Sequence, residues 1–266
     1  MSGYLIVNPS SGNGGDEELV QAARALGVEV HVLRDGDDLE ELARAAEAEV
    51  IGMAGGDGSL APVAAVAIER DLPFVVVPFG TRNHFARDLG LDRDDPVAAL
   101  EAFVDGEERR IDVGRANDRL FLNNVSLGAY ARLVHRRERH RRRRDAFARL
   151  RAFAIVATQR HPVGIVVDGR PIRARVVLAS NNAYTLEVLS VGERDRLDEG
   201  ELHLYAPKGV LRRHWLERHG ARFTVDARAG RLQAAVDGEP DELETPIELV
   251  CEPGALRVLV PRRPVG

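Results

Sequence analysis

Short apolar runs and longer amphipathic stretches alternate along the first hundred residues. The apolar runs are bounded by turn residues and predict strands at 4–7, 28–33, 50–54 and 74–78. The stretches between them carry apolar residues at helical spacing and predict helices at 16–26, 37–48 and about 60–70. Because most of the strands are apolar throughout and helices separate them, the pattern favours a parallel sheet covered on both faces.

The pattern changes near Asp112, where shorter apolar runs begin. They predict strands at 120–125, 164–167, 172–178, 202–205, 222–225 and 232–236, with a hairpin turn at 168–171. One long helical segment, at about 130–159, interrupts the series. This half therefore predicts a mostly antiparallel β domain. The closing run at 255–261 is a further strand, which the pattern alone assigns to neither half.

Composition and charge narrow the class of protein. A net charge of −5 and a pI near 5.9 give no overall basic field, which disfavours nucleic acid as a partner. The single cysteine, Cys251, excludes an internal disulfide and a multi-cysteine zinc site. No apolar run approaches the ~20 residues that span a bilayer, and the N-terminal run is too short for a signal sequence. We expect a soluble, cytoplasmic protein that can still work at a membrane surface.

The most informative stretch is Gly55-Gly56-Asp57-Gly58-Ser59, which lies between a predicted strand and a predicted helix. Its three glycines let the backbone turn tightly and approach a ligand closely. The free N–H groups and the positive dipole end of the following helix favour a phosphate group at this turn. Asp57 adds a carboxylate beside that position. A plain connecting loop is the alternative for this stretch taken alone.

Two other strand-end turns carry similar groups, at 8–12 and 78–83. Ligands bind outside the carboxyl ends of strands in an open parallel sheet, so the three turns are expected to meet at one crevice. Their glycines, hydroxyls and amides predict a nucleotide site. The chain has no Gly-x-x-x-x-Gly-Lys-[Ser/Thr] sequence, which excludes a P-loop, and residues 12–15 lack the Gly-x-Gly-x-x-Gly pattern of a dinucleotide site.

Seven segments in order resemble the signatures of one known family. The first three are Asn8-Pro9-Ser10-Ser11-Gly12, the glycine turn at 55–59 and Pro78-Phe79-Gly80-Thr81-Arg82-Asn83; the others lie at 111–114, 121–128, 197–202 and 236–240. Together they resemble the diacylglycerol kinase catalytic domain family, which includes bacterial lipid kinases and sphingosine kinases. The resemblance covers essentially the whole chain.

The resemblance implies an ATP-dependent kinase that phosphorylates a lipid hydroxyl, such as that of diacylglycerol. It also implies two domains. An NAD-kinase-like α/β domain that binds ATP would span residues 1–112, together with 254–266. A β-sandwich that accepts the lipid would span residues 113–253, and ATP would lie in the cleft.

The family's functional residues map onto this chain by position. Contacts to ATP would come from Asn8, Pro9, Ser10, Ser11, Gly12, Gly55, Gly56, Asp57, Gly58, Ser59, Gly80, Thr81 and Asn83. Asp57 and Asp112 would organise Mg²⁺, and Arg196, Glu199 and Glu201 would form a second, structural metal site. The catalytic group would consist of Asp57, Asp237 and Glu239, with Glu239 as the proton acceptor. Taken alone, Asp237-Gly238 is also typical of a plain hairpin turn.

The chain departs from the family's usual pattern in three places. His84 stands where an aspartate commonly follows the asparagine, and histidine is a poor ligand for Mg²⁺. Ala61-Pro62 replaces a polar Asn-Glu pair, although a proline suits the first turn of a helix. Glu199 replaces an aspartate at the structural metal site.

The basic segment at 135–144 holds seven arginines, two histidines and one glutamate. It predicts either a helix that contacts an anionic membrane at the inner face or a solvated helix face. Stacking aromatic residues are not interleaved with it, so nucleic acid is disfavoured. An edge strand of the second domain could pair in a homodimer.

Two alternatives to a lipid kinase stay open at this point. His84 and Ala61-Pro62 suggest a catalytically weak family member that senses nucleotide or lipid. A kinase of a soluble acceptor is the other alternative, because NAD kinases share a Gly-Gly-Asp-Gly turn. The β-domain segments and the missing second NAD-kinase motif argue against it.

Overall fold

The computed structural model describes residues 2–11, 14–80, 83–128, 164–172, 174, 176–187, 190–191, 193–207 and 215–262. The helix predicted at 130–159 and the basic segment at 135–144 lie outside the described residues. Gly12 and Thr81, two of the expected ATP contacts, lie outside them as well.

The chain divides into two compact units. The first comprises Met1–Val113, Glu193–Asp198 and Pro253–Gly266, and the second comprises Gly114–Gly192 and Glu199–Glu252. The short segment Glu193–Asp198 was expected in the second domain on sequence grounds, but it lies in the first unit. Two long strands, β5 and β18, contribute residues to both units.

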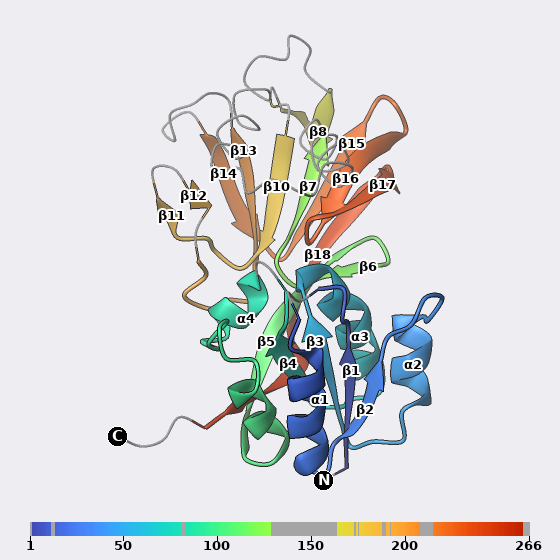
Figure 1. The fold of residues 1–266 in the computed structure, drawn as a ribbon. Coiled ribbons are helices and arrows are strands. Elements are labelled where there is room, and N and C mark those ends of the chain that lie inside the picture. The colour runs from blue at the N-terminus through green and yellow to red at the C-terminus, as the bar shows by residue number, and fades with distance from the viewer. Residues whose placement is uncertain are drawn as a thin grey trace. The chain divides into compact units, whose positions relative to one another are not determined.

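The first unit alternates strands and helices, as Figure 1 shows. Its elements are β1 (Gly3–Val7), α1 (Asp16–Ala25), β2 (Glu29–Val32), α2 (Leu39–Ala45), β3 (Val50–Gly55), α3 (Asp57–Glu69), β4 (Phe74–Pro78), α4 (His84–Asp88), the 3-10 helix η1 (Ala98–Phe103), most of β5 (Gly106–Ala116) and the end of β18 (Ile247–Pro261). The sheet runs in the order β2-β1-β3-β4-β18 with every neighbouring pair parallel. The predicted α/β fold with a parallel sheet is confirmed.

Burial explains why the strands of this unit are apolar throughout. Every residue of β1, β3 and β4 is buried. Helices α1 and η1 contribute Leu19, Leu100 and Phe103 to the core that these strands share. A strand covered on both faces has no solvent side on which polar residues would alternate.

The second unit is built from antiparallel strands. They are the end of β5, β6 (Arg119–Phe121), β7 (Asn124–Gly128), β8 (Ile165–Val167), β9 (Arg170–Pro171), β10 (Val176–Asn181), β11 (Leu186–Glu187), β12 (Ser190–Val191), β13 (Leu202–Pro207), β14 (Trp215–Gly220), β15 (Arg222–Ala227), β16 (Arg231–Val236), β17 (Glu239–Glu244) and the start of β18. One layer is a six-stranded sheet in the order β14-β13-β10-β7-β16-β17. The start of β18 pairs with β15, β15 with β8, and β8 with β9, which forms the other layer.

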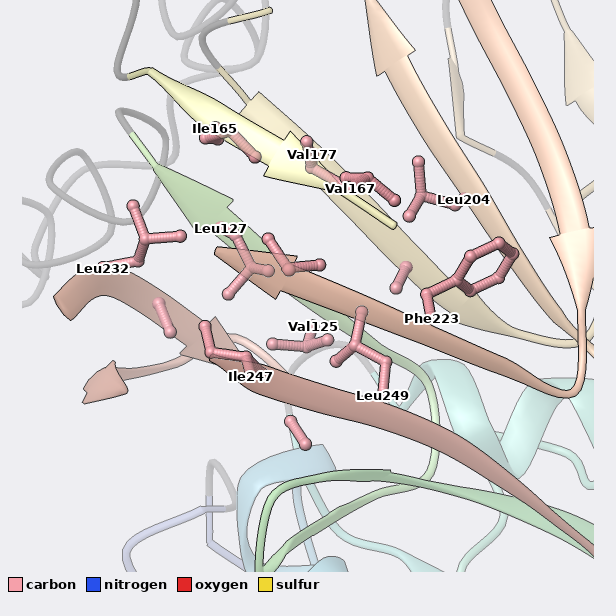
Figure 2. Packing of buried hydrophobic residues seen from close by; sticks show 14 of the residues in the cluster. Val125, Leu127, Ile165, Val167, Val177, Leu204, Phe223, Leu232, Ile247 and Leu249 are labelled. Carbon is pink, nitrogen blue, oxygen red and sulfur yellow. The ribbon is translucent and has the colours of Figure 1, made fainter. Parts of the chain in front are cut away.

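Side chains from both layers meet in one core, which Figure 2 shows. Val125, Leu127 and Leu204 come from the six-stranded sheet, and Phe223 and Leu249 come from the other layer. Each of these five side chains is at most 3% exposed. The predicted β-sandwich is therefore confirmed for the second unit.

Among the boundaries that differ from those that the sequence predicts, three concern strands. The strand expected at 120–125 is two strands, β6 and β7, which are separated by a turn at Leu122 and Asn123. The strand expected at 172–178 is β10, which runs from Val176 to Asn181. The final strand begins at Ile247 rather than 255, because the apolar run around Cys251 continues into it.

Pro62 corrects a further expectation. It lies in the sixth position of α3 rather than in the first turn, because the helix already begins at Asp57. Proline has no N–H, so it cannot donate the helical hydrogen bond to the carbonyl group of Gly58. The helix continues to Glu69 with most of its apolar residues buried, which offsets the lost bond.

Candidate active site

Three strand-end turns of the first unit lie at one edge of the parallel sheet. The amide of Asn8, after β1, donates to the carbonyl of Ala54 in β3 at 2.9 Å. The amide of Phe79, after β4, donates to the carbonyl of Gly55 at 3.2 Å. Because β1, β3 and β4 are parallel neighbours, the three turns emerge side by side. This is the convergence that the sequence predicts.

The glycine turn and the turn after β4 approach so closely that side chains do not fit between them. A Cβ atom on Gly80 would lie 2.5 Å from Cα of Gly56 and 2.8 Å from Oδ1 of Asn83. Asn83 is 3% exposed, accepts the amide of Gly80 at 2.9 Å, and donates to the carbonyl of Gly80 at 2.8 Å. Asn83 therefore closes its own turn, and Gly80 is required for backbone contact.

Gly80→Ala is expected to lower the free energy of unfolding by about 1–3 kcal/mol, as overpacking does in a filled site. The added methyl group would push the turn away from the backbone of Gly56, so ATP-dependent activity should fall as well. Chemical denaturation and an activity assay measure the two effects. Gly220→Ala is the matched control, because a Cβ there meets its nearest atom, in Phe223, at an ordinary 3.7 Å. Equal behaviour of the two variants would contradict the prediction.

Helix α3 begins directly at the glycine turn. Its first residue is Asp57, its N-cap is Gly56, and no side chain caps it. The hydroxyl and the amide of Ser59 both donate to the carbonyl of Gly56, at 2.9 and 3.0 Å, which tightens the first turn. A helix start of this kind presents backbone N–H groups and a positive dipole end, which attract phosphate.

The carboxylate of Asp57 connects the glycine turn to helix α4. Its two oxygens accept the amides of His84 at 3.1 Å and Phe85 at 3.0 Å. Asp57 therefore supplies the acceptor that the N-terminus of α4 lacks, since no side-chain hydrogen bond from its own N-cap, Asn83, caps that helix. Each oxygen keeps further lone-pair capacity, because a carboxylate has about four acceptor sites.

The first turn, at residues 8–11, is shaped by Asn8. Its side-chain oxygen accepts the amide of Ser10 at 3.0 Å, and its carbonyl accepts the amide of Ser11 at 3.1 Å. An asparagine that bonds two residues onward closes a turn without a backbone partner. Ser10 is exposed and Ser11 is half-buried, so both hydroxyls lie at the surface of this edge.

Asp112 is buried in β5, with 2% of its surface exposed. Its Oδ1 atom accepts the amide of Gly254 at 2.9 Å, and its amide donates to the carbonyl of Leu197 at 2.7 Å. These contacts join β5, β18 and the segment Glu193–Asp198 within the first unit. Asp112 therefore has a structural role in addition to the one that the resemblance implies.

In the second unit, Asp237 holds a hairpin in place. It forms the turn between β16 and β17 with Gly238; their φ angles of 47° and 89° are those of a two-residue type I′ turn. The carboxylate of Asp237 accepts three amides of the β6–β7 turn, from Leu122, Asn123 and Asn124, at 2.7–2.9 Å. Glu239 follows as the first residue of β17 and is exposed.

Asp237→Asn is expected to lower the free energy of unfolding by about 1–3 kcal/mol, because a carboxylate that accepts three amides becomes a neutral amide group. Urea denaturation of the whole chain measures the loss. Asp241→Asn, in the same hairpin but at a half-exposed site, is the control and should cost less. A loss no larger than that of the control would contradict the structural role of Asp237.

The residues of the predicted structural metal site are distributed over both units. Arg196 belongs to the first unit and donates to Asp198 at 3.0 Å. In the second unit, Glu199 accepts the amide of Ala183 at 2.7 Å, and Glu201 lies 2.6 Å from Nδ1 of His219. Among the described residues, no three His, Cys, Asp or Glu side chains come together as metal ligands. The structural metal site at Arg196, Glu199 and Glu201 therefore stays a prediction.

Two histidines that sequence reasoning did not single out lie beside these glutamates. The ring of His203 stacks on that of His219 with centroids 5.6 Å apart, and its Nε2 atom lies 3.4 Å from Glu199. Burial is the main cause that lowers the pKa of His203, and the neighbouring glutamates oppose it. The i,i+4 spacing of Glu199 and His203 has no meaning in an irregular segment followed by a strand, so the sequence offered no signal for this pair.

Comparisons with known proteins identify the family of this chain. Residues 2–116 match the family model described as the diacylglycerol kinase catalytic domain. A diacylglycerol kinase of Mycobacterium tuberculosis is 30% identical over 295 residues, which covers 97% of this chain and 94% of that protein. This chain belongs to the diacylglycerol kinase catalytic domain family.

Other members of the diacylglycerol kinase family extend the comparison. A probable lipid kinase of Klebsiella pneumoniae is 31% identical over 137 residues, covering 47% of this chain and 45% of its own. The crystal structure of a diacylglycerol kinase from Bacillus anthracis superposes with a TM-score of 0.72 at 18% identity, over 99% of this chain and 97% of that one. The structural likeness supports the fold, and the sequence relatives identify this family member as a kinase.

The departure at His84 has a simple structural explanation in this family member. The contact with Asp57 uses the main-chain amide of residue 84, so any residue other than proline can make it. The change from aspartate to histidine therefore removes a carboxylate without breaking the link between the two turns. The chain also departs from the family's pattern at Ala61, which lies in α3 and is 9% exposed.

Sequence reasoning did not single out Arg194, which lies in the charge-rich segment Glu193–Asp198 and is 3% exposed. Charge alone predicts exposure, so only the fold could reveal that this arginine is buried.

No helix of the described residues combines the length and apolarity that crossing a membrane requires.

Proposed function

We propose that this protein transfers the γ-phosphate of ATP to the hydroxyl group of a lipid, diacylglycerol or a related alcohol, with Mg²⁺ as cofactor. The observation that carries the proposal is the meeting of three strand-end turns around the N-terminus of α3, in a chain that belongs to a family of lipid kinases. Phosphoryl transfer needs positioning and charge neutralisation more than covalent chemistry from the protein.

The nucleotide half of the site would use backbone groups. The uncapped N-terminus of α3 and the turn at residues 8–11 would donate N–H groups and hydroxyls to the phosphates. Gly56 and Gly80 would let the backbone approach them. Asn83 would act by holding its turn, because its side chain already bonds both polar atoms of Gly80.

Asp57 and Asp112 would hold the magnesium ion. Both supply carboxylate oxygens, which Mg²⁺ prefers, and the described contacts of Asp57 leave lone pairs on each oxygen. A bound ion would neutralise charge on the phosphates. The residues of this chain would orient it and keep the two turns aligned.

Glu239 would accept the proton of the lipid hydroxyl. It is exposed at the start of β17, where an acceptor can reach it, while Asp237 fixes the hairpin on which it stands. A carboxylate that removes this proton strengthens the oxygen as a nucleophile. Asp237 and Glu239 would thus have separate roles, one structural and one chemical.

A kinase of lipids must reach its substrate in a bilayer, and we propose peripheral contact with the inner membrane face through the basic segment at 135–144. Replacing residues 141–144 with serine should weaken binding to vesicles of anionic lipid, because each basic residue contributes about 1 kcal/mol near such a surface. Binding that is unchanged in a vesicle sedimentation assay would contradict the contact.

A homodimer through an edge strand stays a further proposal, which sedimentation velocity can test.

The test of the proposed function is a panel of acceptors with labelled ATP and, separately, GTP. Diacylglycerol, sphingosine and an isoprenoid alcohol in mixed micelles represent the lipid class, and NAD represents a soluble acceptor. Labelled product with at least one lipid, abolished by EDTA and restored by Mg²⁺, supports the proposal. ATP binding without transfer to any lipid would identify a sensor instead, and transfer to NAD alone would identify a kinase of a soluble acceptor.

A further inference from the structure

A six-residue strap, Glu193–Asp198, belongs to the first unit although the chain on both sides of it belongs to the second. Contacts at both ends of the strap join it to the rest of the first unit. The carbonyl of Leu197 accepts the amide of Asp112 at 2.7 Å, and Arg194 binds Asp88 at the end of α4. Asp112 is itself a proposed site residue, and α4 begins directly after another, Asn83.

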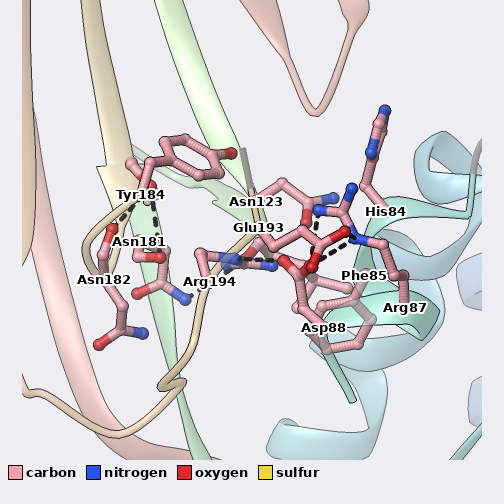
Figure 3. A network of polar contacts seen from close by, with 12 residues as sticks. His84, Phe85, Arg87, Asp88, Asn123, Asn181, Asn182, Tyr184, Glu193 and Arg194 are labelled. Carbon is pink, nitrogen blue, oxygen red and sulfur yellow. Dashed lines mark hydrogen bonds and ion pairs between the residues drawn. The ribbon is translucent and has the colours of Figure 1, made fainter. Parts of the chain in front are cut away.

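The contact between Arg194 and Asp88 is fully buried. Nε of Arg194 lies 2.7 Å from Oδ2 of Asp88, and the two side chains are 0% and 1% exposed. Arg87 occupies the other oxygen of Asp88, at 2.8 Å and 3.1 Å from two of its nitrogens. Figure 3 shows the two guanidinium groups meeting at this one carboxylate.

Two further groups lie around this pair of arginines. Glu193 lies 3.5 Å from Nε of Arg87 and is largely exposed. The guanidinium carbon of Arg194 lies 6.0 Å from the centre of the Phe85 ring, at the outer limit of a cation–π contact. Arg194 therefore contacts α4 at both its acidic end and its aromatic residue.

Helix α4 is only five residues long, so its two ends move together. Its C-terminal residue, Asp88, is held by Arg194, and its first two amides are held by Asp57. A charge-assisted hydrogen bond is short and directional, and a buried one is not weakened by water. The strap, α4 and the glycine turn thus form one chain of contacts within the first unit.

We propose that Arg194 is a positioning residue for the nucleotide: through Asp88 it fixes α4, and through α4 it fixes the glycine turn, because Asp57 accepts the first two amides of that helix. The inference rests on the proposed function, because it assigns ATP to these turns. Arg194 would act through the helix, because its contacts with Asp88 and Phe85 both lie on α4. A plain structural ion pair is the competing explanation, and it predicts a loss of stability without a selective effect on ATP.

The chain permits a variant that should remain folded. In Arg194→Met the carboxylate of Asp88 keeps its contacts with Arg87, so it is not left as an unpaired buried charge, which is the costly case. Arg194→Lys keeps the charge but loses the planar fork that matches α4. Arg257→Met is the matched control, because Arg257 makes an ion pair with both oxygens of Glu108 in the same unit, at 3.0 and 2.7 Å.

The experiment measures KM for ATP, KM for the lipid and kcat for the four proteins, with binding of a non-hydrolysable ATP analogue by calorimetry. Arg194→Met is expected to raise KM for ATP and the analogue's Kd about tenfold, the effect of about one lost charge-assisted contact. KM for the lipid should not change, Arg194→Lys should lie in between, and Arg257→Met should match the wild type. A folded Arg194→Met protein with unchanged KM and Kd for the nucleotide would overturn the inference, and so would an equal rise in Arg257→Met.

Hydrogen exchange provides a second measurement that does not depend on activity. The amides of His84 and Phe85 should exchange faster in Arg194→Met and at the wild-type rate in Arg257→Met. Unchanged exchange in both variants would overturn the inference. If the wild-type protein itself does not bind the ATP analogue, the proposed function fails. If the wild-type protein binds the analogue and the Arg194 variant binds it equally well, only the inference about Arg194 fails.

Discussion

Glu239→Gln is expected to lower the rate of lipid phosphorylation by about 10²–10⁴-fold, which is the usual contribution of a general base. Glutamine has nearly the same shape but does not accept a proton, so the hydroxyl of the lipid would have to attack without this assistance. Binding of ATP should be unchanged, because the proposed nucleotide contacts all lie in turns of the first unit. Steady-state kinetics with the lipid that the acceptor panel identifies, together with calorimetry of an ATP analogue, measure both quantities.

The matched control for this prediction is Glu244→Gln, at the other end of the same strand. Glu244 is exposed as Glu239 is, so the two substitutions remove the same charge from similar surfaces. The control should keep its rate. Because Glu239 is exposed, its replacement should also leave the free energy of unfolding within about 0.5 kcal/mol of the wild type. A Glu239→Gln protein that phosphorylates lipid at more than a tenth of the wild-type rate would remove this residue from the catalytic role.

The nucleotide-side fold was largely predictable because its signals are local. Strands β1, β3 and β4 are apolar over their full length, and a turn with three glycines follows β3. Both features report burial and backbone conformation directly, so the convergence of the turns followed from the rule for parallel sheets. The boundaries of β18 were less predictable, because this one continuous strand pairs with β15 near its start and with β4 near its end. The sequence of β18 itself carries no signal for this change of partner.

The roles of the acidic residues were only partly predictable. Asp57 and Asp237 were singled out for chemistry, and both accept several main-chain amides. A hydrogen bond from a backbone amide depends on how distant segments meet, so no spacing in the sequence announces it. The same reason hid Arg194, whose partner Asp88 lies 106 positions away. A motif can thus point to a residue and still not predict the structural contacts that this residue makes.

Asp57→Ala is expected to have the largest combined effect in the first unit. The amides of His84 and Phe85 lose their acceptor, which should lower the free energy of unfolding by about 1.5–3 kcal/mol. The variant also loses the carboxylate proposed to organise Mg²⁺, and α4 is released from the glycine turn. We therefore expect kcat/KM for ATP to fall by at least about 10²-fold, which corresponds to about 2.7 kcal/mol of transition-state stabilisation.

Asp38→Ala separates these two consequences. Asp38 is the N-cap of α2, and its carboxylate accepts two amides at 2.8 and 3.0 Å in the same unit, so its loss reproduces the structural part of the change alone. We expect a cost of about 1 kcal/mol for this cap and no change in kcat/KM. If Asp57→Ala and Asp38→Ala lose stability alike and both retain the wild-type kcat/KM for ATP, Asp57 is a helix cap supplied by a neighbouring turn and nothing more. A large fall in kcat/KM that is confined to Asp57→Ala would mean that this carboxylate both holds two turns together and takes part in nucleotide binding. These two roles would explain why an aspartate stands at position 57, while position 84, which contributes only its amide to this contact, can be a histidine.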